Sequence, residues 1–479
     1  MPTDSRDSGY QRSVAVVGAG ITGLVAAYEL RRQGVNVTLY EAASHAGGCI
    51  RTTAADGFIA EHGPNSFVTS PAAEALLSRL GLQREVVEAS PTANKRFIVR
   101  RGRLQSVPLS PRGLLRTPLL SAHAKLRLIT EPFVKAGDAD VDESVASFVR
   151  RRFGPETLDY GFDPFISGVF AGDPEQLSMS HALPRLFAME REHGSVFKAV
   201  IGGQRAARRA RRGEPDAAAS TQPVASHPRL ISFRHGMGAL VGTLEASLAG
   251  TLRLQCPVRL LHRNEARWAL DAGEARQSHT RSVDAVVLAT PTHAMSAMEL
   301  PAALRQSAVP LEEVEYPPVS TLTLGFRRAD IAHALDGFGM LIPSVEHRYM
   351  LGALFSSTLF PERAPADHVT ITCFVGGTRY PARAREETPA LLQHVMYDLR
   401  DLLGARGEPV FVKHVLWPRA IPQYNVGYGE VLEAADAMEM SNPGLYLAGN
   451  YRHGISVGDC VSSGQRVAQR VAAYLTRAG

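Results

Sequence analysis

A glycine-rich stretch near the N-terminus, Gly18-Ala19-Gly20-Ile21-Thr22-Gly23, directly follows an apolar run at residues 14–17. This G-x-G-x-x-G spacing lets the backbone approach a pyrophosphate, and the free N–H groups at the start of the next helix favour an anion. Glu41 ends a second apolar run about 20 residues later, where its carboxylate can accept hydrogen bonds from ribose hydroxyls. The same carboxylate would repel a 2′-phosphate, so we predict a dinucleotide site that disfavours NADP.

Three further segments contain glycines that would let the backbone pass close to an extended ligand. The first is Ala46-Gly47-Gly48-Cys49-Ile50-Arg51, in which the arginine can pair with a phosphate. The second is Gly63-Pro64-Asn65-Ser66, which alone would be interpreted as a surface turn. In the third, an expected strand ends at Gly449, and Ile455-Ser456-Val457 precede a C-terminal helix. The start of that helix could direct its positive end toward the pyrimidine side of a reduced flavin.

The elements that must position these segments follow from the hydrophobic periodicity. We expect strands at 14–17, 35–40 and 58–61, helices at 24–33, 70–82 and 388–403, a hairpin at 96–108, and mostly helices from 109 to 205. Residues 316–380 alternate between apolar and polar side chains, which predicts an antiparallel sheet. With 479 residues the chain is too long for one hydrophobic core, so two or three domains are expected.

The composition argues against several classes of protein. Apolar residues make up 45% of the chain and charged residues 21%, which is typical of a globular protein. The four cysteines, Cys49, Cys256, Cys373 and Cys460, are scattered, which disfavours a zinc site or a disulfide framework and suits a reducing compartment. We expect no secretory signal and no spanning helix. The net charge of +5 is compatible with an arginine-rich surface or with attraction to anionic lipid. The arginines at 205–212 indicate a solvated loop or a lipid-headgroup contact and not a nucleic-acid site, because no aromatic residues are interleaved for stacking on bases.

In this order the glycine segments resemble the flavin amine-oxidase superfamily, and residues 13–473 are most similar to the protoporphyrinogen oxidase family. The specific similarity lies in residues 96–99, 165–174, 316–319, 337–339 and 417–424, which a shared flavin fold would not require. The resemblance implies an α/β protein with a Rossmann-type FAD-binding domain of the glutathione-reductase-like kind, an α+β substrate domain and an inserted helical membrane-binding domain. The expected ranges are 12–88, 229–295 and 420–479 for the FAD domain, 89–205 for the helical domain, 206–228 for a mobile basic loop, and 296–419 for the substrate domain.

The resemblance also implies non-covalent FAD, with the glycine turn at the pyrophosphate, Glu41 and Ala42 at the adenosine ribose, and the backbone of Val258 at the adenine. The remaining residues would lie along the ribityl chain and the flavin ring. The full set of implied contacts is Gly18, Ala19, Gly20, Ile21, Thr22, Gly23, Glu41, Ala42, Gly48, Cys49, Arg51, Gly63, Pro64, Asn65, Ser66, Val258, Trp417, Gly449, Ile455, Ser456 and Val457. Cys49 differs from the residues typical of the family, and we expect it to contribute only its backbone. No metal is expected.

For the substrate, the resemblance implies a porphyrinogen, an apolar macrocycle that carries propionates. Arg96 resembles the propionate-binding arginine of the family, Phe338 the aromatic residue that stacks on a pyrrole ring, and Val319 the aliphatic residue opposite it. Gly168 lies in the stretch that borders the macrocycle in relatives. The implied reaction removes six electrons from protoporphyrinogen IX in haem biosynthesis and reduces three O₂ to H₂O₂. No general base stands out in the sequence, and geometry is the main demand of hydride transfer.

Several alternatives stay open at this point. The nearest is a coproporphyrinogen III oxidase, and the others are an amine oxidase of the same fold, a carotenoid desaturase and a flavin-binding scaffold without turnover. An amine oxidase often has a lysine near the flavin, and we expect no suitable lysine in this chain, since Lys413 is the only lysine after Lys198. We expect a cytoplasmic protein that is peripherally associated with the cell membrane, and we consider a homodimer and hand-off of the product to a chelatase. No nucleic-acid partner is expected.

Overall fold

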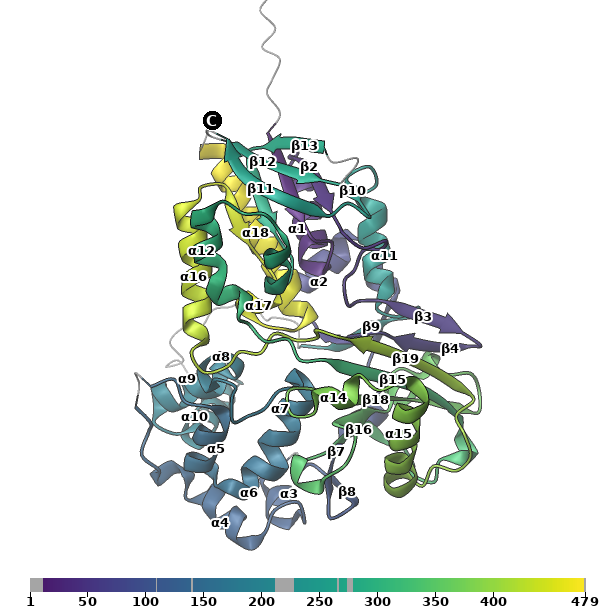
Figure 1. Cartoon of the computed structure of the whole chain (residues 1–479). Helices are drawn as coiled ribbons and strands as arrows, with labels where there is room; N and C mark the ends of the chain where they lie inside the picture. Colours follow the sequence, from purple (N-terminus) through teal and green to yellow (C-terminus); the bar gives the residue numbers. More distant parts are fainter. Residues whose placement is uncertain are drawn as a thin grey trace, which may run out of the picture.

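The computed structural model describes residues 12–108, 110–138, 141–211, 228–264, 267–273 and 279–477. Figure 1 shows three regions: a sheet surrounded by helices at the top, a second sheet at the lower right and a group of helices at the lower left. Helix α1 (Ile21–Arg32) and the C-terminal helix α18 (Val457–Arg477) lie side by side in the first region. Both ends of the chain therefore build the region that contains the glycine turn, which we call the cofactor region.

A five-stranded parallel sheet forms the centre of the cofactor region, in the order β10-β2-β1-β14-β20. Its strands are β1 (Ser13–Val17), β2 (Asn36–Tyr40), β10 (Leu252–Arg253), β14 (Ala285–Leu288) and β20 (Leu445–Leu447). Side chains of β1 alternate between two cores: Val14 and Val16 lie in one, Ala15 and Val17 in the other. Burial of both faces explains why the inner strands β1 and β14 and the neighbouring β20 are nearly continuous apolar runs.

Different elements cover the two faces of this sheet. One face packs against α1, α18, α2 (Pro71–Arg79) and α11 (Gly238–Ser247). The other packs against an antiparallel sheet of β11 (Val258–Asn264), β12 (Arg267–Ala272) and β13 (His279–Val283), and against α12 (Ala302–Glu312) and α16 (Tyr428–Ser441). Shorter elements complete the region: β5 (Phe67–Val68), η1 (Leu82–Arg84), β6 (Val86–Glu88), β9 (Leu230–Phe233), η5 (Thr292–Ala297) and α17 (Asn450–His453). The hairpin of β3 (Thr52–Ala55) and β4 (Phe58–Glu61) extends from this region to the second sheet. The strands and helices predicted within residues 14–82 are confirmed.

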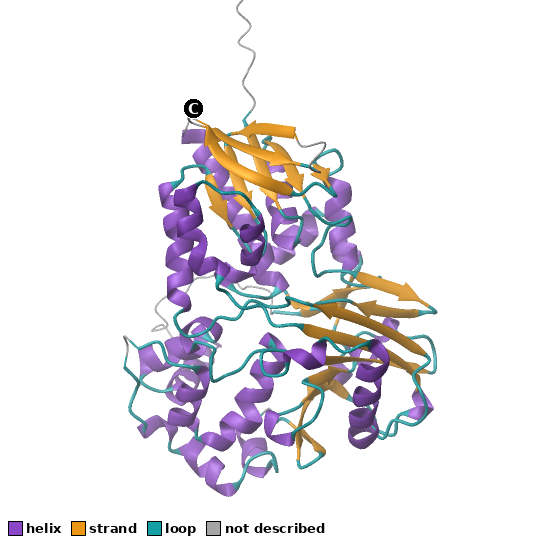
Figure 2. Cartoon of the chain, viewed as in Figure 1, coloured by secondary structure: helices purple, strands orange, loops and turns teal. Residues whose placement is uncertain are grey.

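The second sheet, drawn in orange at the lower right of Figure 2, has seven strands in the order β19-β15-β18-β17-β16-β7-β8. They are β7 (Lys95–Arg100), β8 (Arg103–Ser106), β15 (Val319–Arg327), β16 (Gly337–Leu341), β17 (Gly352–Leu354), β18 (His368–Gly376) and β19 (Phe411–Trp417). The antiparallel pairing predicted within 316–380 is confirmed, whereas β7 joins β16 in parallel. Helix α15 (Thr388–Leu403) matches its predicted range and contributes Leu391, Val395 and Leu399 to the core on one face of the sheet.

Shorter helical turns connect the strands of the second sheet to one another and to their neighbours. They are η2 (Pro91–Asn94), η6 (Arg328–Asp330), η7 (Ser344–Glu346), α13 (Ser356–Leu359), η8 (Pro361–Arg363) and α14 (Pro381–Ala384).

The helical region has its own apolar core, which includes Phe148, Val149, Ile166 and Leu177. Its elements are α3 (Pro111–Arg116), α4 (Ala122–Ile129), η3 (Glu131–Phe133), α5 (Val145–Phe153), α6 (Pro155–Thr157), the π-helix η4 (Leu158–Phe162), α7 (Asp163–Phe170), α8 (Met179–Ala182), α9 (Pro184–His193) and α10 (Val196–Arg211). Side chains that cap helices begin several of them; Ser144, for example, accepts a hydrogen bond from the Ser147 N–H at the start of α5.

Three predicted domain boundaries need correction. The helical range 89–205 includes β7 and β8, but these strands belong to the seven-stranded sheet because Phe97 and Val99 point into its core. The substrate range 296–419 includes α12, which packs instead against α16 of the cofactor region. Residues 206–211 of the predicted mobile loop continue α10, and residues 212–227 lie outside the described residues.

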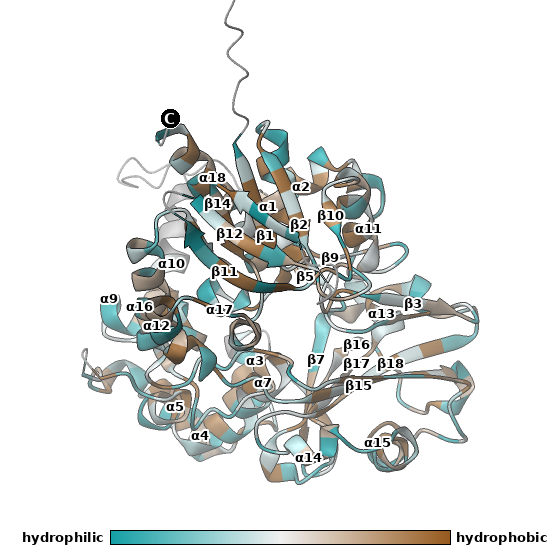
Figure 3. Cartoon of the chain, turned by 45° about the horizontal axis from the view of Figure 1, so that its top comes forward, coloured by the Kyte–Doolittle hydropathy of each residue, from teal (hydrophilic) through white to brown (hydrophobic). Residues whose placement is uncertain are grey.

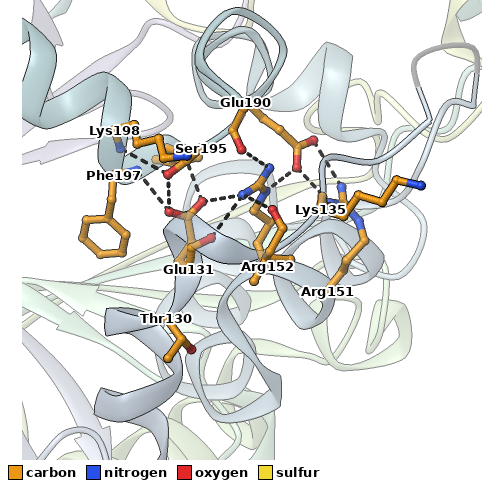
Figure 4. A network of polar contacts seen from close by, with 12 residues as sticks. Thr130, Glu131, Lys135, Arg151, Arg152, Glu190, Ser195, Phe197 and Lys198 are labelled. Carbon is orange, nitrogen blue, oxygen red and sulfur yellow. Dashed lines mark hydrogen bonds and ion pairs between the residues drawn. The ribbon is translucent and has the colours of Figure 1, made fainter.

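Buried charges tie the helical region together (Figure 4). Arg152 is fully buried and pairs with Glu131, at 2.7 Å, and with Glu190. Glu131 also accepts hydrogen bonds from Ser195 Oγ, at 2.5 Å, and from the Val196 N–H, at 3.1 Å, at the start of α10. Removing one partner from such a network leaves an uncompensated buried charge. We therefore regard this network as the structural anchor of α10.

None of the helices in the described ranges is long and apolar enough to cross a membrane. The same part of the chain contains no group of His, Cys, Asp and Glu side chains that could hold a metal ion.

Candidate active site

The predicted glycine turn lies between β1 and α1 with the expected close packing. Gly18 has a φ of +98°, and a Cβ there would lie 2.9 Å from the carbonyl oxygen of Ala289. A Cβ on Gly23 would overlap the Gly18 carbonyl oxygen and lie 3.2 Å from the Ala289 Cβ. Gly20 is the N-cap of α1, has no side-chain cap, and faces open space, since nothing lies within 4 Å of a Cβ built on it. The first N–H groups of α1 are therefore available to an anion.

The second glycine segment closes against the first. Gly47 forms an isolated bridge with Gly20, and its N–H donates to the Ala19 carbonyl at 2.8 Å. Gly48 lies next to Gly20, because a Cβ on it would be 3.4 Å from the Gly20 Cα. Arg51 follows on the surface. Glycines of the two segments thus lie side by side at the start of α1, where the absence of side chains would let a ligand approach the backbone closely.

Glu41 is fixed by the backbone on both sides. One carboxylate oxygen accepts the Ala19 N–H at 2.7 Å, and the other accepts the Ala43 N–H at 2.8 Å. Each oxygen keeps a further lone pair for a ribose hydroxyl. Cys256 N–H donates to the Glu41 carbonyl at 2.8 Å, so the start of β11, and with it Val258, lies beside Glu41.

The loop with Gly63, Pro64, Asn65 and Ser66 lies between the cofactor region and the seven-stranded sheet. A Cβ on Gly63 would lie 2.5 Å from the Cys49 carbonyl oxygen, so this loop packs directly on the second glycine segment. Trp417 at the end of β19 donates its indole N–H to the His62 carbonyl at 2.7 Å. Trp417 therefore reaches the loop from the other side, and the structure brings these predicted residues together.

The predicted C-terminal segment also meets the glycine turn. Helix α18 crosses α1 closely, since a Cβ on Gly464 would lie 2.6 Å from the Thr22 carbonyl oxygen. Ser456 accepts the Asp459 N–H at 3.1 Å and donates its hydroxyl to the Asp459 carboxylate at 2.6 Å, which caps the start of this helix. Gly449, at the end of β20, has a φ of +149° that favours glycine. Ile455, Ser456 and Val457 thus lie at the edge of the same cradle.

Arg96 and Phe338 are neighbours on the face of the seven-stranded sheet opposite α15, and α7, which carries Gly168, packs against the strand of Phe338. The Arg96 guanidinium carbon lies 5.2 Å from the centre of the Phe338 ring, within the range of a cation–π contact. Arg96 itself is exposed and forms no ion pair with any carboxylate in the described part of the chain. Gly168 on α7 packs on the side chain of Leu341, three residues after Phe338.

Val319 lies on the same sheet but not beside Phe338. Strands β17 and β18 separate β15 from β16, which amounts to about 14 Å at normal strand spacing. Val319 pairs with Trp417 and shares its face of the strand with Thr321, whose hydroxyl is 3.4 Å from the His62 carbonyl oxygen. The structure therefore places Val319 near the Gly63 loop, and its role opposite Phe338 across a bound macrocycle stays a prediction.

The residues present fit FAD. Gly20 and Gly48 leave the space that a pyrophosphate requires, and the N-terminus of α1 carries no acidic side chain in its first turn. Glu41 offers free lone pairs, and the Gly63 loop, Trp417 and α18 continue the cradle toward the sheet face with Arg96. When bound, FAD supplies hydride acceptance and reaction with O₂.

Sequence reasoning missed His62 and Thr53, and it considered Lys413 only as a lysine unsuited to an amine oxidase. Only 7% of the His62 surface is exposed, and burial, followed by the nearby charges of Lys413 and Arg51, lowers its pKa to about 4. The ring Nε2 lies 2.7 Å from Thr53 Oγ1. Single polar residues before a glycine loop carry no distinctive spacing, so no sequence signal could have identified them.

Known proteins share this architecture. The model of the family described as "Flavin containing amine oxidoreductase" matches residues 21–472. Protoporphyrinogen oxidase 2 of Arabidopsis thaliana is 37% identical over 482 residues, which cover 97% of this chain and 94% of the plant protein. The protoporphyrinogen oxidase of Homo sapiens is 32% identical over 486 residues and covers 96% of this chain and 98% of its own.

Two solved structures show the same fold. A protein from Exiguobacterium sp. 255-15, provisionally named a protoporphyrinogen oxidase, superposes with a TM-score of 0.78 at 24% identity and covers 98% of this chain and 99% of its own. Cyclohexylamine oxidase from Brevibacterium oxydans superposes with a TM-score of 0.68 at 17% identity and covers 98% and 100%. At these identities the likeness concerns the fold alone.

The fold and the glycine-lined cradle define a flavin-dependent oxidoreductase, and the chain belongs to the flavin containing amine oxidoreductases. The identity of more than 30% over nearly the whole chain narrows this class. Within it, the chain is a member of the protoporphyrinogen oxidase family.

Proposed function

We propose that the protein is an oxygen-dependent protoporphyrinogen IX oxidase of haem biosynthesis. It removes six electrons from protoporphyrinogen IX to give protoporphyrin IX, and three O₂ are reduced to three H₂O₂. The observation that carries this proposal is that the sheet that meets the FAD cradle at Trp417 also presents Arg96, which has no carboxylate partner among the described residues, beside the aromatic Phe338. Full-length similarity to proteins named protoporphyrinogen oxidase supports the choice of substrate.

The chain's own residues would bind and orient the macrocycle. Arg96 can take a propionate carboxylate in a bidentate pair. Phe338 and Leu341 offer apolar surface to the pyrrole rings, and Gly168 lets α7 approach the sheet closely enough to exclude water. No residue on this face needs to act as a strong base, since orienting the reacting carbon is the main requirement.

The function is tested by mixing the purified, FAD-loaded protein with protoporphyrinogen IX without oxygen. We expect the flavin absorption to bleach, to recover in air, and H₂O₂ and protoporphyrin IX to form in a ratio of three to one. Coproporphyrinogen III and a primary amine serve as parallel substrates. Faster bleaching by coproporphyrinogen III would reassign the substrate, bleaching by the amine would indicate an amine oxidase, and no bleaching at all would leave a flavin-binding scaffold.

A second part of the proposal concerns the membrane. Helix α4 and η3 expose Leu126, Ile129 and Phe133, of which 60%, 60% and 88% of the surface is accessible. Leu126 and Ile129 lie three residues apart on one face of α4 and Phe133 follows on η3, while Ala124 and Leu128 point into the core of the helical region. Figure 3 shows this mixture of apolar and polar residues along α4. We name Leu126, Ile129 and Phe133 the α4 patch and propose that it enters the interface of an anionic membrane, aided by the exposed cations Arg116 and Lys135.

This proposal predicts binding to lipid vesicles. The protein should sediment with vesicles that contain phosphatidylglycerol at low salt, and detergent should release it. Phe133→Ser should weaken binding about tenfold, because a phenyl ring no longer enters the interface. Tyr397→Ser on α15, where 69% of the tyrosine is exposed, is the matched control and should bind normally. Equal sedimentation of the Phe133→Ser and wild-type proteins would exclude the α4 patch. Cytoplasmic location, a homodimer and hand-off to a chelatase remain predictions.

A further inference from the structure

His62 is held from three directions at the junction of the cofactor region and the seven-stranded sheet. Its carbonyl oxygen accepts the Trp417 indole N–H at 2.7 Å and lies 3.4 Å from the Thr321 hydroxyl. Its ring Nε2 lies 2.7 Å from the Thr53 hydroxyl on β3. Trp417 and His62 are 355 residues apart in sequence, so this contact joins two separate parts of the chain.

The position of His62 determines the position of the Gly63 loop. His62 directly precedes Gly63, and Gly63 packs against the Cys49 carbonyl with no room for a side chain. The loop is therefore confined between the second glycine segment on one side and the ends of β15 and β19 on the other. A shift of the His62 carbonyl would move the loop relative to the sheet that carries Arg96 and Phe338.

The imidazole ring of His62 is uncharged at neutral pH. The side chain is almost fully buried and lies near the positive charges of Lys413 and Arg51, which disfavour an imidazolium ion. The hydrogen bond to Thr53 is therefore between two uncharged groups. It can orient the ring without changing the net charge beside the cofactor.

We propose that Trp417 is a positioning residue that sets the spacing between the flavin and the substrate sheet through the His62 carbonyl. The inference rests on the proposed function, because it assumes that the Gly63 loop lies along bound FAD. Trp417 is also one of the implied FAD contacts; the role proposed here is the additional one of its indole N–H, and an aromatic ring without this donor would not hold the His62 carbonyl in place. Thr53 supports the same loop from the side of the imidazole.

The test is Trp417→Phe, which keeps an aromatic ring and removes the N–H donor. We expect the visible flavin bands to shift, FAD to dissociate several times faster, and kcat to fall about tenfold with KM within about twofold, since small misplacement penalises hydride transfer more than binding. Thr53→Val should cause a smaller change of the same kind, and Thr53→Ser, which restores the hydroxyl, should behave as wild type.

The other tryptophan of the chain, Trp268, provides the matched control. Trp268 is buried and donates its indole N–H to the Pro443 carbonyl at 3.1 Å, on the far side of the parallel sheet. Trp268→Phe should lower thermal stability to a similar degree but leave the flavin spectrum and kcat unchanged. Identical spectral changes in both tryptophan variants, or none in Trp417→Phe, would overturn the proposal. If wild type does not oxidise protoporphyrinogen IX, the spectrum and the FAD release rate still decide the role of Trp417.

Discussion

A Gly20→Ala protein is expected to fold normally and to bind FAD about 5–150-fold more weakly than wild type. Nothing lies within 4 Å of a Cβ built on Gly20, so the methyl group has space in the protein itself. That space is where a pyrophosphate must approach the N-terminus of α1, and one extra methyl group in a close-packed contact costs about 1–3 kcal/mol. Titration of the apoprotein with FAD measures the affinity, and thermal unfolding of the apoprotein measures the stability of the fold.

Substitutions at two other glycines distinguish an effect on FAD binding from an effect on folding. Gly23→Ala places its Cβ against the Gly18 carbonyl, so the apoprotein itself should lose stability. Gly242→Ala lies within α11 in open space and should change neither FAD affinity nor fold, apart from a gain of about 0.5–1 kcal/mol from helix propensity. Normal FAD affinity in Gly20→Ala would contradict the assignment of the cradle.

Local patterns predicted most of the elements that hold the cradle. The glycine turn, both flanking strands and α15 could be identified because each has a strong period or a distinctive glycine spacing over a short stretch. The parallel pairing of β7 with β16 could not, because Gly337 and Lys95 are far apart in sequence and a strand pattern does not name its partner. The domain boundary at residue 89 was wrong for this reason.

In the candidate site, too, some features could be predicted from the sequence and others could not. Glu41, Gly63 and Trp417 could be named, but the bond from Trp417 to the His62 carbonyl depends on backbone geometry that no residue type reveals. The buried pair of Arg152 with Glu131 was likewise hidden, since a charged residue in a helix is normally assigned to a solvated face. Val319 was placed correctly in a strand, yet its position relative to Phe338 depends on the two strands between them.

Arg96→Ala is expected to raise KM for protoporphyrinogen IX by tens of fold, equivalent to about 1.5–3 kcal/mol of lost charge-assisted binding. Arg96 is exposed, contacts the Phe338 ring and has no carboxylate partner among the described residues, so its charge is available to a substrate propionate. FAD content and the visible spectrum should not change, because the glycine cradle is built from other elements. Steady-state kinetics with the free acid measure the effect.

Three comparisons distinguish a substrate contact from a structural role of Arg96. A porphyrinogen esterified at its propionates offers no carboxylate, so Arg96→Ala should cost much less with this substrate. Arg96→Lys should recover only part of the affinity, because an ammonium cannot make the planar two-point contact. Arg103→Ala, which removes an exposed arginine from the neighbouring strand β8, should leave KM unchanged. Equal losses with the acid and the ester would mean that Arg96 supports Phe338 and the sheet edge, and the propionate would then have to bind elsewhere on this face.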